Sequence, residues 1–386
     1  MKTTGWRWIG AGVVLVGLIA TAIFWGRGHD EGWSSFLQGD PKRGGRLFFD
    51  RGCAHCHSVF GHGGKVASDL GWRALKEHMS FAQLVGVMWN HGPTMWQKMR
   101  DSGAPLPSLA EREMGDIFAY LYVLGYMEEG GDAEKGLRVW ASRGCASCHT
   151  VGGGGEAVGP DLSRLEVPAD AIAWAQRMWN HALAMEKAAT DKGIPWPEFQ
   201  DGEMADLLVF VRSRNAGSTH NLGLMPANPA AGRDLFRDKG CISCHAMRGK
   251  GGNSAPDLGR AKEPPRSVVS MVELMWNHVP KMSKAIREQE MEWPQLSERE
   301  MADLITYLYS VRYFDEPGDA SAGVSVFAEK QCSLCHSLAG EQKEGPDLRL
   351  LEGRFSPAQM AYAMWKHGPQ MYDKMKSRGI SWSSFE

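Results

Sequence analysis

The sequence predicts an all-α protein in which four copies of one helical domain follow an N-terminal transmembrane helix. Three observations predict this: a cysteine motif recurs four times at whole-domain intervals, segments of helical periodicity recur beside each motif, and an apolar run lies near the N-terminus. The 386 residues suffice for three or four domains of about 100 residues. The net charge of −2 lacks the basic character of nucleic-acid-binding proteins, so that class is excluded.

All eight cysteines belong to one motif, C-x-x-C-H, which occurs four times. This motif is typical of haem c attachment: two thiols add to the vinyl groups of one haem, and the adjacent histidine binds its iron. A zinc site would need two such pairs, and a redox dithiol would not need the histidine. We therefore predict four haem c groups. The predicted attachment residues are Cys53, Cys56, Cys145, Cys148, Cys241, Cys244, Cys332 and Cys335, and the predicted iron ligands beside them are His57, His149, His245 and His336.

The motifs lie 92, 96 and 91 residues apart, so each copy is a whole domain rather than a short repeat. Every copy has a glycine nine residues before its first cysteine and an aromatic residue five before it. A glycine beside an aromatic residue on a short helix predicts that another helix crosses closely there. The expected crossing partners have helical periodicity and are the segments Glu113–Tyr120, Glu203–Phe210 and Glu300–Tyr307.

Between the motif and that helix, each copy has a loop ending in Asp-Leu and then a helix that contains Met-Trp-Asn/Lys-His. On these motifs, each copy resembles a class I, mitochondrial-type cytochrome c domain, over nearly everything after about residue 36. The resemblance implies that a loop carbonyl accepts a hydrogen bond from the motif histidine. That acceptor falls on Pro160, Pro256 and Pro346, and Ser68 offers a backbone carbonyl in the first copy.

The expected domains are the N-terminal segment 1–33 and four cytochrome c domains, 34–127, 128–215, 216–314 and 315–386. The last copy ends before its closing helix, so we expect an incomplete fourth domain. Three explanations stay open: a truncated sequence, a helix supplied by a partner, or an open haem.

Three residues recur in every copy, in the middle helix or the loop after it, as candidates for the sixth iron ligand. The resemblance implies a methionine after the middle helix, five residues beyond the Asn or Lys position, which selects Met95, Met185, Met282 and Met371. The alternative is the histidine four residues earlier, at His91, His181, His278 and His367. We expect the third candidate, the methionine before each tryptophan, to pack against the porphyrin together with that tryptophan.

The N-terminal run from Trp8 to Trp25 holds 18 uncharged residues, a length that suits a membrane-spanning helix. Positive residues before it favour an N-terminus inside and the remaining chain on the periplasmic side of a bacterial inner membrane. A signal peptide cleaved after Ala20-Thr21-Ala22 is the alternative, and it would leave a soluble periplasmic protein.

These features predict a membrane-anchored tetrahaem cytochrome c that carries electrons and is not itself an enzyme. The expected partners are redox proteins: a quinol-oxidising membrane complex as donor, and an oxidase, reaction centre or other cytochrome as acceptor. Two alternatives stay open. One is a haem enzyme with one open coordination site, and the other is a mainly structural subunit of a larger respiratory or photosynthetic complex.

Overall fold

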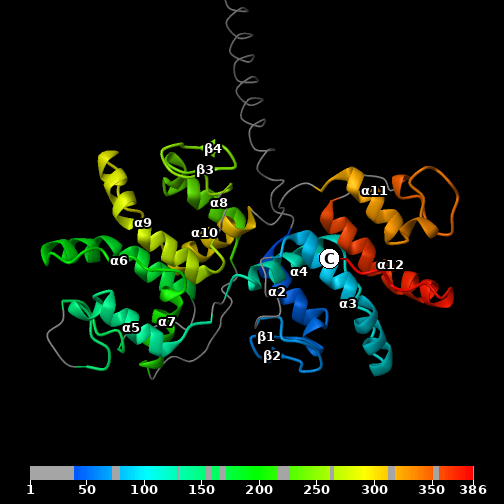
Figure 1. Ribbon diagram of the computed structural model, residues 1–386, viewed down its shortest axis with the longest axis horizontal. Helices are drawn as coiled ribbons and strands as arrows, with labels where there is room; N and C mark the ends of the chain where they lie inside the picture. The colour runs from blue at the N-terminus through cyan, green and yellow to red at the C-terminus, as the bar shows by residue number, and fades with distance from the viewer. Residues whose placement is uncertain are drawn as a thin grey trace, which may run out of the picture.

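The computed structural model describes residues 39–71, 79–127, 130–153, 158–164, 171–215, 227–260, 265–311, 318–350 and 356–385, and most of them are helical (Figure 1). The predicted membrane segment Trp8–Trp25 lies outside these residues. Within them, no helix combines the length and the apolar character that crossing a membrane needs.

The first domain sets the plan that the others follow. In chain order it consists of α2 (Pro41–Asp50), the 3₁₀ turn η2 (Cys53–His55), the antiparallel pair β1 (Ser58–Val59) and β2 (His62–Gly63), α3 (Phe81–Ser102) and α4 (Glu111–Leu124). The long middle helix α3 begins at a capping box in which Ser80 and Gln83 bind each other's backbone N–H, and it ends at Gly103 in the left-handed conformation.

The second and third domains repeat this plan. The second contains α5 (Ala133–Ser142), η3 (Cys145–Ser147), α6 (Ala171–Asp191) and α7 (Glu203–Ser213). The third contains α8 (Pro229–Asp238), η4 (Cys241–Ser243), the pair β3 (Ala246–Met247) and β4 (Lys250–Gly251), α9 (Val268–Glu288) and α10 (Glu298–Ser310). The closing helices α4, α7 and α10 contain the three segments whose helical periodicity predicted them.

The predicted close crossing is present in the first three domains. A β-carbon added to Gly44, Gly136 or Gly232 would lie only 1.9, 2.0 and 1.9 Å from a backbone carbonyl oxygen of the closing helix. These oxygens belong to Asp116, Asp206 and Asp303, whose carboxylates also accept a backbone N–H at the start of the first helix of the same domain, at 2.7, 2.7 and 2.5 Å. Glycine is required here because only a residue without a side chain permits this approach.

The fourth domain consists of α11 (Ala320–Glu329), η5 (Cys332–Leu334), η6 (Leu348–Leu350) and α12 (Pro357–Ser377). Among the described residues, no atom lies within 4 Å of a β-carbon added to Gly323, and α11 buries none of its side chains. Val324, on the same helix, is 61% exposed. The face of α11 that a closing helix covers in the other domains is therefore open within the described part of the chain.

The domains do not pack in sequence order. The middle helices pair across domains: α6 of the second packs along α9 of the third, and α3 of the first packs along α12 of the fourth. The first and third domains meet where Tyr126 of the first packs on Tyr309 with ring centres 4.1 Å apart, and where Val268 N–H donates to the Tyr126 carbonyl. Figure 1 shows the resulting order, with the second and third domains at one end, the first in the centre and the fourth at the other end.

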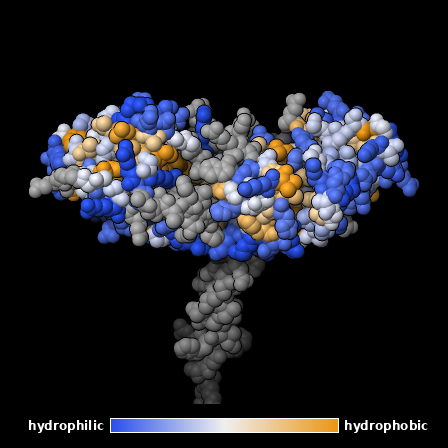
Figure 2. Space-filling view, turned by 90° about the horizontal axis from the view of Figure 1, so that it is seen from below, coloured by the Kyte–Doolittle hydropathy of each residue, from blue (hydrophilic) through white to orange (hydrophobic). Residues whose placement is uncertain are grey.

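One hydrophobic core runs through all of these contacts. It includes Phe81 and Phe118 of the first domain, Leu208 of the second, Met301 of the third and Ala361 of the fourth. The surface around it is largely hydrophilic with scattered hydrophobic patches (Figure 2). A shared core makes the four domains one packed assembly rather than separate units on linkers.

Candidate haem-binding sites

Each C-x-x-C-H motif begins at a sharp backbone reversal. The residue before the first cysteine has a positive φ in all four domains: Gly52 at 86°, Gly144 at 76°, Gly240 at 82° and Gln331 at 63°. This left-handed conformation suits glycine and strains glutamine. The reversal ends the preceding helix and starts the 3₁₀ turn that brings both cysteines and the histidine to one side.

The cysteines are half-buried and none forms a disulfide. Burial raises the pKa of the first thiol of the motif to about 11 in each of the first three domains, at Cys53, Cys145 and Cys241. In the fourth domain, burial raises the pKa of Cys332 as well. A thiol with a raised pKa stays protonated at neutral pH.

The motif histidines are oriented in the same way in all four domains. Each Nδ1 donates to a backbone carbonyl of the loop, at 2.9 Å to Ser68, 3.1 Å to Pro160, 2.9 Å to Pro256 and 3.1 Å to Pro346. The predicted contact is therefore confirmed, including the first copy, where serine replaces proline. Because Nδ1 carries the hydrogen, Nε2 is left with a free lone pair, as a metal ligand requires.

The loop that supplies these carbonyls is held by the aspartate of its Asp-Leu sequence. The Asp69 carboxylate accepts hydrogen bonds from the Ser58 hydroxyl at 2.7 Å and from the backbone N–H groups of Phe60, Gly61 and Gly71 at 3.1, 2.7 and 2.7 Å. Asp257 accepts three backbone N–H groups in the third domain. The recurring aspartate therefore holds the loop in place. The loop carbonyl just before the aspartate in turn orients the motif histidine.

The middle helices differ from the expectation. We expected the ligand methionines in a loop after the helix, but Met95, Met185, Met282 and Met371 all lie inside α3, α6, α9 and α12. The histidines four residues earlier lie one turn before them on the same helices. In the first domain, the ring centres of His57 and His91 are 6.4 Å apart with an angle of 61° between the ring planes.

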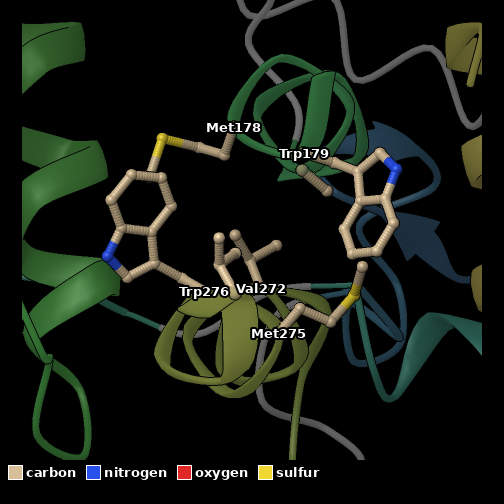
Figure 3. A pocket seen from close by; sticks show the side chains of 7 residues that line it. Met178, Trp179, Val272, Met275 and Trp276 are labelled. Atoms are coloured by element: carbon tan, nitrogen blue, oxygen red, sulfur yellow. The ribbon is translucent and has the colours of Figure 1, made fainter. Parts of the chain in front are cut away.

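The tryptophans of the middle helices lie at the domain interfaces and pack on the neighbouring domain, and their expected contact with a porphyrin stays a prediction. Trp179 stacks on Trp293 of the third domain at 4.3 Å, and Trp276 stacks on Trp196 of the second at 4.2 Å. Met178 and Met275 line a small cavity between these two domains, each reaching toward the other domain's tryptophan (Figure 3). The sequence contains one sign of this role, since an asparagine follows the tryptophan in three of the four copies.

The contacts are reciprocal, as a two-fold interface demands. The Trp179 indole donates to the Pro294 carbonyl and the Trp276 indole to the Pro197 carbonyl, both at 2.7 Å. Asn180 binds both backbone groups of Leu296, and Asn277 binds both of Phe199. The second and third domains thus use the same surface against each other.

The proline inside α9 supports this interface. Pro280 has no N–H to donate to the carbonyl of Trp276, and that carbonyl accepts the Trp196 indole at 3.1 Å instead. Pro93 in α3 frees the Trp89 carbonyl in the same way, and the Trp382 indole of the fourth domain donates to it at 3.1 Å. A residue that normally breaks a helix therefore exposes a hydrogen-bond acceptor to the neighbouring domain.

The residues present fit a covalently held haem in each copy. Two half-buried thiols and one histidine with a free Nε2 come from the same turn, and the histidine is oriented by a backbone carbonyl as ligating histidines are.

Two segments of the chain, 133–215 and 229–312, match the cytochrome c family model. They correspond to the second and third domains. A comparison with curated proteins found no match. The two family matches support a c-type cytochrome with more than one domain, and they imply covalently bound haem c and haem-based electron transfer.

Proposed function

We propose that the chain is a tetrahaem cytochrome c that carries electrons between a quinol-oxidising or other membrane redox complex and a downstream acceptor. The observation that carries this proposal is the fourfold site: in every domain the motif histidine donates Nδ1–H to the same loop carbonyl position. Two of these domains match the family model, and the other two repeat the same site geometry.

Each haem would be held by the two cysteines and the histidine of one motif. The haem supplies one-electron chemistry at its iron, and the protein sets its potential through the axial ligands, burial and hydrogen bonding. The chain's own residues orient the histidine and, through the shared core, hold neighbouring domains together. The sixth ligand is either the methionine that the spacing selects or the histidine one turn before it.

The proposed electron route follows the packing rather than the sequence. The domain contacts give the order second, third, first, fourth, so the route runs between the second and fourth domains at the two ends. The first domain is the link between the pair at one end and the fourth domain at the other. Donor and acceptor would dock at these ends, on the periplasmic side of a membrane to which the N-terminal segment anchors the chain.

Counting haems tests the proposal directly. We expect four covalently bound haems per chain in the purified protein and three in a variant that carries Cys145→Ala and Cys148→Ala. A wild-type count of two, matching only the segments 133–215 and 229–312, would contradict the tetrahaem proposal. Carbon monoxide binding to the reduced native protein would instead favour a haem enzyme with an open site.

The route is tested by removing one haem at a time. A variant with Cys53→Ala and Cys56→Ala loses the haem of the linking domain, so we expect the fourth domain's haem to be reduced in a separate, slower phase after rapid mixing. The matched control is the second-domain variant, in which the third, first and fourth domains remain connected and no separate phase is expected. Identical kinetics in both variants would contradict the route.

A further inference from the structure

His91 occupies the position that faces the motif histidine of the first domain. His57 comes from the motif turn and is held through its Nδ1 by the Ser68 carbonyl, whereas His91 comes from α3. Their ring centres are 6.4 Å apart, with the ring planes at 61°. The two imidazoles are therefore opposed across the space between the motif and the middle helix.

The separation matches two ligands on one metal ion. A metal–imidazole bond is about 2 Å and the ring centre lies about 1 Å from the ligating nitrogen, so opposed ligands have ring centres about 6 Å apart. An edge-to-face contact between two aromatic rings has a similar spacing. The orientation of the equivalent histidines distinguishes the two cases.

In the second and third domains, the middle-helix histidine is already oriented as a ligand. His181 Nδ1 donates to the Arg177 carbonyl at 2.9 Å, and His278 Nδ1 donates to the Leu274 carbonyl at 2.7 Å. A carbonyl only accepts, so the hydrogen is on Nδ1 and the lone pair is on Nε2. Metal-binding histidines almost always donate their other N–H to such an acceptor, and the motif histidines of the same two domains do so as well.

At least one of the rival methionines is engaged elsewhere. Met282 packs against the cluster of Ala182, Val279 and Trp293, which lies between the second and third domains. Its side chain therefore contributes to the contact with the neighbouring domain, one turn beyond His278 on α9.

We propose that the middle-helix histidines, and not the methionines, are the sixth iron ligands. His91, His181 and His278 carry the argument, and His367 takes the same position in the fourth domain. This proposal rests on the haem binding proposed above. Histidine–histidine ligation gives a lower potential than histidine–methionine ligation, so these haems belong at the low-potential side of an electron-transfer chain.

The wild-type protein gives the first test. Ferric haem with methionine ligation shows a methionine–iron charge-transfer band in the far red, so we expect the oxidised full-length protein to lack this band while containing four low-spin haems. A band at the strength of four haems would overturn the proposal. A protein without covalent haem would instead overturn the proposed function, which the haem count reports separately.

Two variants of the first domain give the second test. In His91→Gly we expect an unchanged haem count, one of four haems converted to high spin by electron paramagnetic resonance, and recovery of low spin on adding free imidazole. In the matched variant Met95→Leu, we expect all four haems to stay low-spin. High spin in Met95→Leu together with low spin in His91→Gly would overturn the assignment. If His91→Gly does not accumulate, the wild-type band decides.

Discussion

The crossing of α8 and α10 gives the sharpest prediction for stability. In Gly232→Ala, the new β-carbon would lie 1.9 Å from the Asp303 carbonyl oxygen, 2.5 Å from its carbonyl carbon and 2.7 Å from the Tyr307 β-carbon. Two of these atoms are backbone atoms of a helix, so no rotation of a side chain relieves the clash. The helices must separate by about 1.5 Å to restore ordinary van der Waals contact.

The expected cost follows from two opposing effects. Overpacking a close-packed core costs about 1–3 kcal/mol, and sometimes more. Replacing glycine by alanine inside a helix returns about 1 kcal/mol. Because the clash is with backbone atoms, the upper end of the range applies, and we expect a net loss of about 2 kcal/mol in the free energy of unfolding.

The fourth domain supplies the matched control. Gly323 has the same place in α11, yet no described atom lies within 4 Å of an added β-carbon. Gly323→Ala therefore keeps only the gain in helix propensity, about 1 kcal/mol at most. The two substitutions should shift stability in opposite directions, although the local sequences are equivalent.

The assay is denaturant unfolding of the full haem-loaded protein, followed by far-ultraviolet circular dichroism. We expect the first unfolding transition to move to lower denaturant in Gly232→Ala, and no loss of stability in Gly323→Ala. If both variants unfolded like the wild type, the helices would not cross as closely as described, and the reasoning would be refuted.

Three further predictions concern single contacts. Trp293→Leu removes the stack on Trp179 and one indole hydrogen bond, so we expect a loss of about 2–4 kcal/mol and faster hydrogen exchange in α6 and α9; unchanged exchange would contradict the pairing. Gln331→Gly removes the side chain from a residue in the left-handed backbone conformation, so it should raise the free energy of unfolding by about 1 kcal/mol. A lower free energy of unfolding would show that the glutamine backbone is not strained. Asp116→Ala leaves Arg43 and the Asp40 backbone N–H without the buried carboxylate that binds both, so we expect a loss of about 3 kcal/mol by thermal unfolding, with a smaller loss in Asp116→Asn.

The contacts within one copy could be predicted from the sequence. The Gly-aromatic pair predicted the helix crossing, and the loop position predicted the acceptor for the motif histidine. Both depend on residues at a fixed spacing in one domain, and four copies show that spacing repeatedly. Ser68 was predictable for a physical reason, because the contact uses a backbone carbonyl that any residue supplies.

The contacts between copies could not be predicted in the same way. The spacing rule placed the methionines beyond the end of the middle helix, and Pro93 and Pro280 favour an early helix end. Both helices continue past these prolines, and tryptophans of the neighbouring domain bind the carbonyls that the prolines leave free. Tertiary packing thus overrides the local preference of proline for a helix end. A spacing measured within one copy contains no information about packing between copies.

Two positions at which one copy differs from the other three nevertheless indicate which domains pair with each other. Leu106 stands where the other copies have Trp196, Trp293 and Trp382, and Lys366 stands where they have asparagine. One departure is in the first copy and the other in the fourth, which are distant in sequence and paired in space.

Both differences affect the same half of the interface between the first and fourth domains, the half in which α12 of the fourth domain meets the loop after α3 of the first. In the half that keeps the motif, Trp89 stacks on Trp382 at 4.1 Å and Asn90 binds both backbone groups of Phe385. In the other half, the Trp365 indole still donates to the Pro107 carbonyl at 3.1 Å, but the stacked tryptophan and the asparagine are replaced by Leu106 and Lys366. In the other interface halves, the asparagine binds the backbone of the loop that contains the tryptophan. Where that tryptophan is replaced by leucine, the asparagine is replaced as well, so the two positions change together. The interface between the first and fourth domains therefore keeps the full set of tryptophan and asparagine contacts on one side only, whereas the second and third domains keep it on both sides.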